Sequence, residues 1–327
     1  MVSGTEVERN HVYVIPPNFD LALEGNLLQL VPREDSRKHH LSIDFFLRSL
    51  AAQRGAQAIG VVLSGNGSDG TEGLRAIKVE GGITFAQDPQ TAKFGDMPER
   101  AIKAGVVDIG MPIAALAAEL GRLGRHPYLA AAAAVDEPSE KDEGSFEKIL
   151  ALVRGKTGVD FSEYKRGTIE RRAARRMALR EQEDLQGYLH LLQTDDAEAV
   201  ALCEDVLIHV TSFFREPATF EALAKEILPR MLASKPKGAP LRAWVAGCST
   251  GEEAYSLAIA FLESASLGEH PRAIQIFGSD VSEKAVEKAR SGLFSDTALR
   301  DLSEEMRRRH FVKLEHGYRI SKQVREL

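Results

Sequence analysis

The sequence has 327 residues, of which 43% are hydrophobic and 28% are charged, and its formal net charge is −6. The length suits about two domains, the composition is that of a soluble protein, and the acidic balance gives no indication of nucleic-acid binding. No apolar run approaches a membrane helix, no signal peptide is visible, and two distant cysteines favour a reducing cytoplasm over a structural zinc site, so we expect a cytoplasmic protein with no metal and no integral membrane segment.

The first 127 residues alternate between strand and helix patterns. Short apolar runs predict strands over 11–17, 58–65 and 83–87, and apolar residues at helical spacing predict helices over 41–55 and 71–82. This alternation implies a parallel sheet with helices on its faces.

Two changes of pattern follow. Residues 128–144 combine an alanine run with an acidic, polar patch, which predicts a linker. From 145 to 230 the pattern is helical throughout. From residue 241 the alternation returns as strand, helix, strand and helix, over 241–247, 252–264, 273–280 and 282–292.

The glycine-containing loop "GCSTG" lies between a predicted strand and a helix that begins with Glu252 and Glu253. A helix N-terminus attracts phosphate, but two glutamates stabilise the same dipole and repel a pyrophosphate. The loop also lacks the P-loop lysine and the dinucleotide GxGxxG pattern. A phosphate-free nucleoside with a cationic group fits better, and S-adenosylmethionine is such a ligand. Asp280, at the end of the next strand, is placed to accept both ribose hydroxyls. Alternatively, the glutamates only stabilise their helix, and Asp280 is the N-cap of the helix over 282–290.

Three segments resemble CheR-type protein-glutamate methyltransferases: "VTSFFREPATFEAL", "WVAGCSTGEEAYSLAI" and "IFGSDVSEKAVEKARSGLF". The resemblance spans about 180 residues and implies a Rossmann-like class I methyltransferase domain that binds S-adenosylmethionine. Asp280 would hold the ribose, and Thr211 and Arg215 would face the cofactor and the methyl transfer. His209 stands where some family members carry asparagine. The full set of cofactor-binding residues implied is His209, Thr211, Arg215, Gly247, Ser249, Thr250, Gly251, Glu252 and Asp280.

The substrate would be a glutamate side chain, which is ionised at pH 7 and needs no general base. It needs alignment with the methyl group, and an arginine grips a carboxylate in a fixed geometry. Arg215 is the candidate for this catalytic role; the alternative is a structural pair with a nearby acid.

The segment "KRGTIERRAARRMALR" predicts a helix with two arginine rows, made up of Arg171, Arg175, Arg172, Arg176 and Arg180. A solvated surface helix and a nucleic-acid contact are alternatives, but no aromatic residue is interleaved. We favour an acidic protein partner, because the helical subdomain of CheR-like enzymes is thought to recognise the methylated helices of receptors.

The first 127 residues resemble the later part of CheB-type protein-glutamate methylesterases, through "HVYVIPPN", "IDFFLRSLA" and "AIGVVLSGNGSDGTEGLRAIKVEGGITFAQDPQTAKFGDMPERAIKAGVVD". The family uses a serine, a histidine and an aspartate. Asp69 would be the aspartate, and Met97 falls in the second active-site loop. Ser64, Ser68, His39 and His40 do not match the serine or histidine segments, so we expect an inactive methylesterase module and a sheet without its first strands.

We therefore expect a CheB–CheR hybrid truncated at both ends, with a cofactor pocket open on one side because the chain stops at Leu327. Its fold class is α/β: an incomplete parallel-sheet methylesterase fragment, an all-α subdomain and a methyltransferase domain. The expected boundaries are 1–127, a linker over 128–144, 145–214 and 215–327. The expected function is methylation of glutamates in a chemoreceptor-like protein with acidic helices. The alternative is a non-catalytic module that docks an acidic helical partner.

Overall fold

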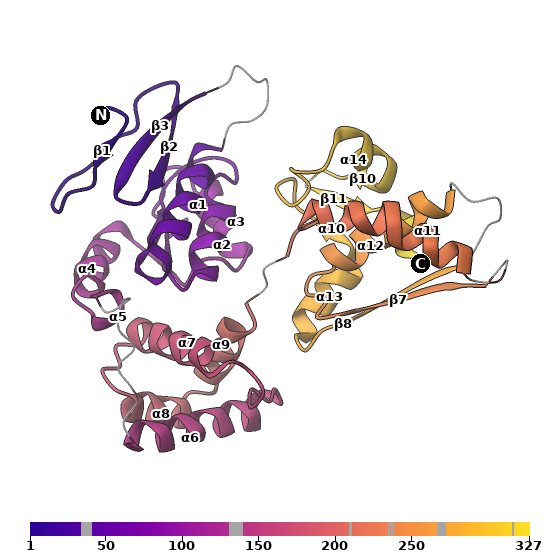
Figure 1. Ribbon diagram of the computed structural model, residues 1–327. Coiled ribbons are helices and arrows are strands. Elements are labelled where there is room, and N and C mark those ends of the chain that lie inside the picture. The colour runs from indigo at the N-terminus through magenta and orange to yellow at the C-terminus, as the bar shows by residue number, and fades with distance from the viewer. Residues whose placement is uncertain are drawn as a thin grey trace. The chain divides into compact units, whose positions relative to one another are not determined.

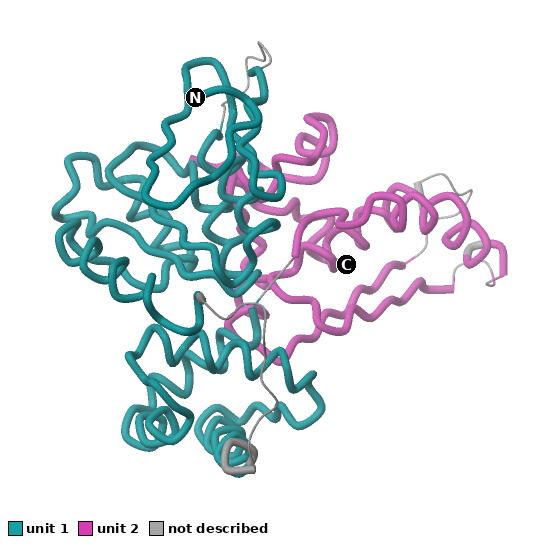
Figure 2. The backbone as a smooth tube through the Cα atoms, turned by 60° about the vertical axis from the view of Figure 1, so that its left-hand side comes forward, with its two compact units in different colours: residues 1–208 teal, residues 209–327 magenta. Residues whose placement is uncertain are grey.

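The computed structural model describes residues 1–33, 41–130, 140–208, 211–234, 236, 239–266, 273–315 and 317–327. The chain divides into two compact units, residues 1–208 (unit 1) and residues 209–327 (unit 2), which Figures 1 and 2 display.

Unit 1 begins with an N-terminal α/β region, residues 1–130. Its strands form an antiparallel sheet of order β1-β3-β2 and a parallel sheet of order β4-β5-β6. The strands are β1 (Thr5–Glu6), β2 (Phe19–Glu24), β3 (Leu27–Pro32), β4 (Ile59–Val62), β5 (Ile83–Gln87) and β6 (Ile109–Met111). The helices are α1 (Ser42–Arg54), the 3-10 turn η1 (Gly55–Gln57), α2 (Thr71–Val79), α3 (Asp96–Lys103), α4 (Ile113–Leu123) and α5 (Pro127–Ala130).

The parallel sheet confirms the fold class expected for this region. Strand β5 has the predicted bounds, and every one of its residues is buried, as an apolar run in a parallel sheet requires. The strand predicted over 11–17 is wrong, because the backbone there forms no sheet pairing and Val12 and Val14 are 90% and 73% exposed. The strands of this part of the chain are instead β2 and β3.

Unit 1 continues with a helical region, residues 140–208. It contains α6 (Glu140–Thr157), α7 (Arg166–Leu179), α8 (Leu185–Thr194) and α9 (Asp196–Val206). Their apolar faces share one core, in which Ile149, Tyr188 and Leu192 are fully buried. This confirms the all-α subdomain. Most of the predicted linker, residues 131–139, lies outside the described residues.

Unit 2 is built around two parallel strands with helix α12 on one face. Its helices are α10 (Pro217–Ala222), the π-helical turn η2 (Leu223–Ile227), α11 (Leu228–Ser234), α12 (Glu252–Ser266), α13 (Glu283–Ser291), α14 (Glu304–His310) and α15 (Lys322–Arg325). Its strands are β7 (Leu241–Ala246), β8 (Ile274–Ser279), β9 (Leu293–Phe294), β10 (Phe311–Lys313) and β11 (Tyr318–Ile320). The β7–α12–β8 order confirms the Rossmann-like pattern. Among the described residues, no helix has both the length and the apolar character that crossing a bilayer requires.

Candidate functional site

The candidate site is the loop 247–251, where β7 ends and α12 is about to begin. Strands β7 and β8 pair in parallel as far as their last residues, so their carboxyl ends lie side by side. The N–H groups of Gly247 and Cys248 both donate to the Ser279 carbonyl, at 2.8 and 2.9 Å. These two bonds fix the start of the loop against the end of β8.

The loop then turns through three left-handed conformations, at Gly247 (φ 72°), Ser249 (φ 50°) and Gly251 (φ 98°). At Gly251 a Cβ atom would stand 2.9 Å from the Cβ of Ala289, so the close approach of α13 also requires glycine here. The glycines of the motif therefore shape a tight backbone cradle between a strand and a helix.

Asp280 ties the loop to the end of β8. Its Oδ2 accepts the Ser249 N–H at 2.8 Å, and its Oδ1 accepts the Ser282 N–H at 2.8 Å. The N-cap of α13 is Ser282, whose hydroxyl accepts from Ala285, so the alternative that Asp280 is this N-cap is wrong. Each carboxylate oxygen has a further lone pair, which leaves Asp280 able to accept ribose hydroxyls.

The two glutamates at the start of α12 have different environments. Glu252 is 6% exposed, and its Oε2 accepts the Thr250 hydroxyl at 2.6 Å, whereas Glu253 is exposed to solvent. Glu252 thus places negative charge beside the loop, where it would disfavour a phosphate.

Ser249 supplies an observation that bears on a ligand. Its Oγ is buried and has no hydrogen-bond partner within the part of the chain that the structure describes. Leaving a buried hydroxyl unpaired costs about 1–3 kcal/mol, which a bound polar group would recover. The Ser249 hydroxyl, the Glu252 carboxylate and the spare lone pairs of Asp280 fit a nucleoside that carries a cationic group and no phosphate.

The segment 211–216 lies against α12 in the same unit. Phe213 is buried, with ring centroids 4.8 Å from Phe294 and 5.2 Å from Phe311. The Phe214 N–H donates to Ser256 Oγ at 2.9 Å. Thr211 is half-buried and Arg215 is exposed, whereas His209, also predicted to bind the cofactor, lies outside the described residues.

The arginine helix predicted to bind a partner is α7, and most of its charge is used inside unit 1. Arg172 donates to the carbonyls of Lys78 and Val79, at 2.8 and 2.5 Å, and so satisfies the C-terminal end of α2. Arg176 makes two bonds to the buried Glu198, at 2.8 and 2.5 Å. Helix α7 therefore contributes Arg172 to a contact with the N-terminal α/β region and Arg176 to a contact within the helical region.

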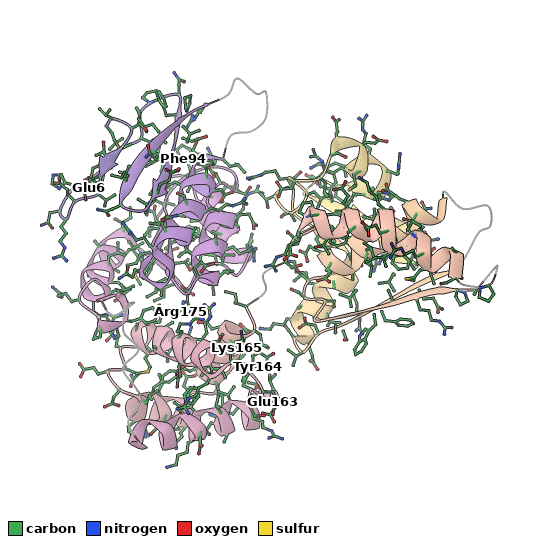
Figure 3. All side chains as sticks on the ribbon, viewed as in Figure 1. Glu6, Phe94, Glu163, Tyr164, Lys165 and Arg175 are labelled. Atoms are coloured by element: carbon green, nitrogen blue, oxygen red, sulfur yellow. The ribbon has the colours of Figure 1, made fainter. Side chains whose placement is uncertain are left out.

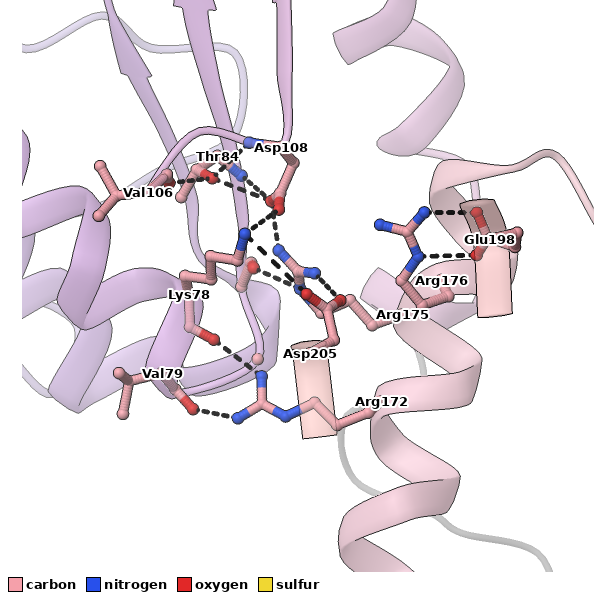
Figure 4. Close-up of polar contacts among 12 residues, drawn as sticks. Lys78, Val79, Thr84, Val106, Asp108, Arg172, Arg175, Arg176, Glu198 and Asp205 are labelled. Carbon is pink, nitrogen blue, oxygen red and sulfur yellow. Dashed lines mark hydrogen bonds and ion pairs between the residues drawn. The ribbon is translucent and has the colours of Figure 1, made fainter. Parts of the chain in front are cut away.

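Arg175 is fully buried where these two regions meet (Figures 3 and 4). Its guanidinium donates to the carboxylates of Asp108 and Asp205 and to the Gly82 carbonyl. Lys78 Nζ adds a second cation, 3.1 Å from Asp108. The prediction of a partner-binding arginine row is wrong for Arg172, Arg175 and Arg176, because their guanidinium groups bond within the chain.

The other two arginines of the predicted surface differ from these. Arg171 is exposed, and its Nε–H donates to the Gly167 carbonyl of its own helix at 3.2 Å. Arg180 is partly exposed and pairs with Asp195 at 2.7 Å. For Arg171 and Arg180 a partner contact stays a prediction.

The charge network predicts acid sensitivity of unit 1. Burial acts to raise the pKa of Asp108, but the charges of Arg175 and Lys78 outweigh it and lower this pKa from 3.8 to about 2. Because the folded-state pKa lies below the unfolded one, the stabilisation is present above about pH 4 and is lost as the pH falls toward 2. We expect a loss of about 2 kcal/mol over this window. Urea unfolding followed by circular dichroism from pH 5 to pH 2 tests this, with Asp108→Asn as the variant whose profile should be flatter.

Asp69 has a structural role at the first helix of the chain. Its Oδ1 and Oδ2 accept the N–H groups of Asp44 and Ile43, at 2.9 and 3.1 Å, and so hold the first turn of α1. Ser64 accepts the Phe94 N–H at 2.9 Å, and Met97 packs beside Gly65. His39 and His40 lie outside the described residues.

Three protein-family models match consecutive parts of the chain. CheB methylesterase matches residues 1–120, the all-alpha domain of CheR methyltransferase matches 144–207, and the SAM binding domain of CheR methyltransferase matches 209–327. The last match contains the loop, Asp280 and the segment 211–216.

Relatives include an uncharacterised 104.1 kDa protein from the region 3' of hypE in Rhodobacter capsulatus, 38% identical over 98% of this chain and 36% of its own length. A chemotaxis protein methyltransferase of Salmonella typhimurium is 31% identical over 52% of this chain and 57% of its own length. A protein-glutamate methylesterase/protein-glutamine glutaminase 3 of Burkholderia thailandensis is 33% identical over 37% of this chain and 34% of its own length. The chain thus spans between about a third and three fifths of the length of these relatives.

Proposed function

This chain joins a CheB methylesterase region to the all-alpha and SAM-binding regions of a CheR methyltransferase, and we propose that it transfers a methyl group from S-adenosylmethionine to glutamate side chains of a chemoreceptor-like protein. The observation that carries this proposal is the loop 247–251, in which Asp280 holds the Ser249 N–H while the Ser249 hydroxyl stays unpaired among the described residues.

Different residues around the loop would bind different parts of the cofactor. Asp280 would accept the ribose hydroxyls, and Glu252 would attract the cationic end through the charge that repels phosphate. Bound there, S-adenosylmethionine supplies an electrophilic methyl group. The matching of the family's SAM binding domain to 209–327 supports this choice of cofactor.

Arg215 would orient the glutamate that accepts the methyl group. The substrate carboxylate is already ionised, so the chain needs to desolvate it and align one oxygen with the methyl carbon. A guanidinium fork holds a carboxylate through two parallel bonds, which fixes that alignment. The segment 211–216, anchored on α12, would carry Arg215 to the cofactor.

We expect Arg215→Ala to lower the rate of methyl transfer about 100-fold, because the substrate carboxylate loses its charge-assisted hydrogen bonds. The assay incubates the chain with methyl-labelled S-adenosylmethionine and chemoreceptor-containing membranes of the organism that encodes this chain, and measures base-labile methyl released from protein. Arg242→Ala, a change at an exposed arginine of the same unit, is the matched control. A wild-type chain that binds the cofactor but forms no base-labile methyl ester would contradict the proposed reaction.

The CheB-type region would have no esterase activity in this chain. The reason is the sequence, in which Ser64, Ser68, His39 and His40 do not match the serine or histidine segments of the CheB-type family. The alternative, a non-catalytic module that docks an acidic helical partner, would have to use Arg171 and Arg180, because Arg172, Arg175 and Arg176 bond within the chain.

A further inference from the structure

Arg215 lies in a turn with an unusual backbone. The residues on either side of it, Phe214 (φ 48°) and Glu216 (φ 57°), are both left-handed although neither is glycine. Such conformations are strained for L-residues with a side chain and persist only where their surroundings hold them. The direction in which Arg215 leaves the backbone therefore depends on contacts made by its neighbours.

Ser256 links this turn to α12 by hydrogen bonds. It is fully buried, and its hydroxyl donates to the Glu252 carbonyl at 2.6 Å while accepting the Phe214 N–H at 2.9 Å. One end of this bridge is the first residue of α12, whose carboxylate lies beside the cofactor loop. The other end is the residue immediately before Arg215.

We propose that Ser256 is a positioning residue for methyl transfer, which sets Arg215 in register with the cofactor loop by linking Phe214 to Glu252. This rests on the proposed function, because it assigns Arg215 to the substrate carboxylate. Aromatic packing also supports the turn, because the ring centroids of Phe214 and Phe220 lie 5.1 Å apart. These apolar contacts hold the Phe214 side chain, whereas the Phe214 N–H is held, among the described residues, by Ser256.

Ser256→Ala removes the bridge and leaves a good helix-forming residue in place. We expect kcat for methyl transfer to fall about tenfold, while the Kd for S-adenosylhomocysteine changes less than twofold, because the loop and Asp280 are untouched. Exchange of the Phe214 amide hydrogen, measured by NMR, should become about tenfold faster. Ser256→Thr keeps a hydroxyl and should recover slow exchange.

Ser49 provides a matched control in unit 1. Its hydroxyl donates to the Phe46 carbonyl and accepts the Leu23 N–H, at 2.7 and 3.0 Å, so Ser49→Ala removes the same kind of bridge far from the cofactor loop in sequence. It should leave kcat unchanged. Fluorescence of Trp244, the single tryptophan and a residue of unit 2, shows whether Ser256→Ala is folded at the assay temperature.

The outcomes separate this inference from the proposed function. Unchanged Phe214 exchange with unchanged kcat in Ser256→Ala would overturn the positioning role, and so would loss of kcat together with unfolding of unit 2. A wild-type chain without methyl transfer would overturn the proposed function, and with it the role of Arg215, whatever the Phe214 exchange.

Discussion

Replacing Arg175 with alanine is expected to lower the free energy of unfolding of unit 1 by about 3–5 kcal/mol, the cost of leaving buried carboxylates without their cation. Figure 4 shows the Arg175 guanidinium between Asp108 and Asp205, whose side chains are only 1% and 5% exposed, so both carboxylates depend on this cation rather than on bulk water. Lys78 stands 3.1 Å from Asp108 but 3.9 Å from Asp205, and it compensates only part of the loss. The measurement is urea unfolding followed by circular dichroism.

Arg171→Ala is the matched control, because Arg171 lies on the same helix and is exposed. It should change the free energy of unfolding by less than about 0.5 kcal/mol. Trp244 fluorescence reports on unit 2, and its transition should not move in either variant. Arg175→Ala with a stability loss no larger than that of Arg171→Ala would show that the network does not join the two regions of unit 1.

Replacing Asp280 with alanine is expected to weaken binding of S-adenosylhomocysteine by at least about 100-fold. The change removes the acceptor of the Ser249 N–H, and with it the lone pairs offered to the ribose. Asp280→Asn keeps an acceptor oxygen but loses the charge, so its affinity should lie between the two. Isothermal titration calorimetry measures all three chains.

Asp301→Ala is the control for this series, since Asp301 is an exposed aspartate of the same unit. Its affinity should equal that of the wild type. An Asp280→Ala chain that binds within about threefold of the wild type would remove Asp280 from the site, since the lost hydrogen bonds to a charged group should cost more than this.

Short sequence patterns predict the elements whose structure depends on residues close together along the chain. The apolar run 83–87 predicts β5 because a strand of a parallel sheet is buried on both faces. The run 11–17 misled because alternating valines favour a strand only where another strand pairs with it. The loop 247–251 was predictable because its glycines, and the two glutamates that follow it, stand at fixed spacing between a strand and a helix.

Long-range pairing explains what the sequence could not predict. The carboxylates that pair with the arginines of α7 lie far away in sequence. Asp108 and Asp205 are 67 and 30 residues from Arg175, and Glu198 is 22 residues from Arg176. A charge run viewed alone is indistinguishable from a solvated surface helix. Ser256 was missed for a related reason, since a serine inside a helix carries no signal until Phe214 is placed beside it.

Calorimetric titration of the wild-type chain with S-adenosylmethionine and, separately, with ATP tests the central claim most directly. The buried Glu252 beside the loop 247–251 predicts saturable one-to-one binding of the cationic nucleoside and no heat from the phosphorylated one. ATP binding as tight as that of S-adenosylmethionine, or no binding of S-adenosylmethionine, would contradict the account.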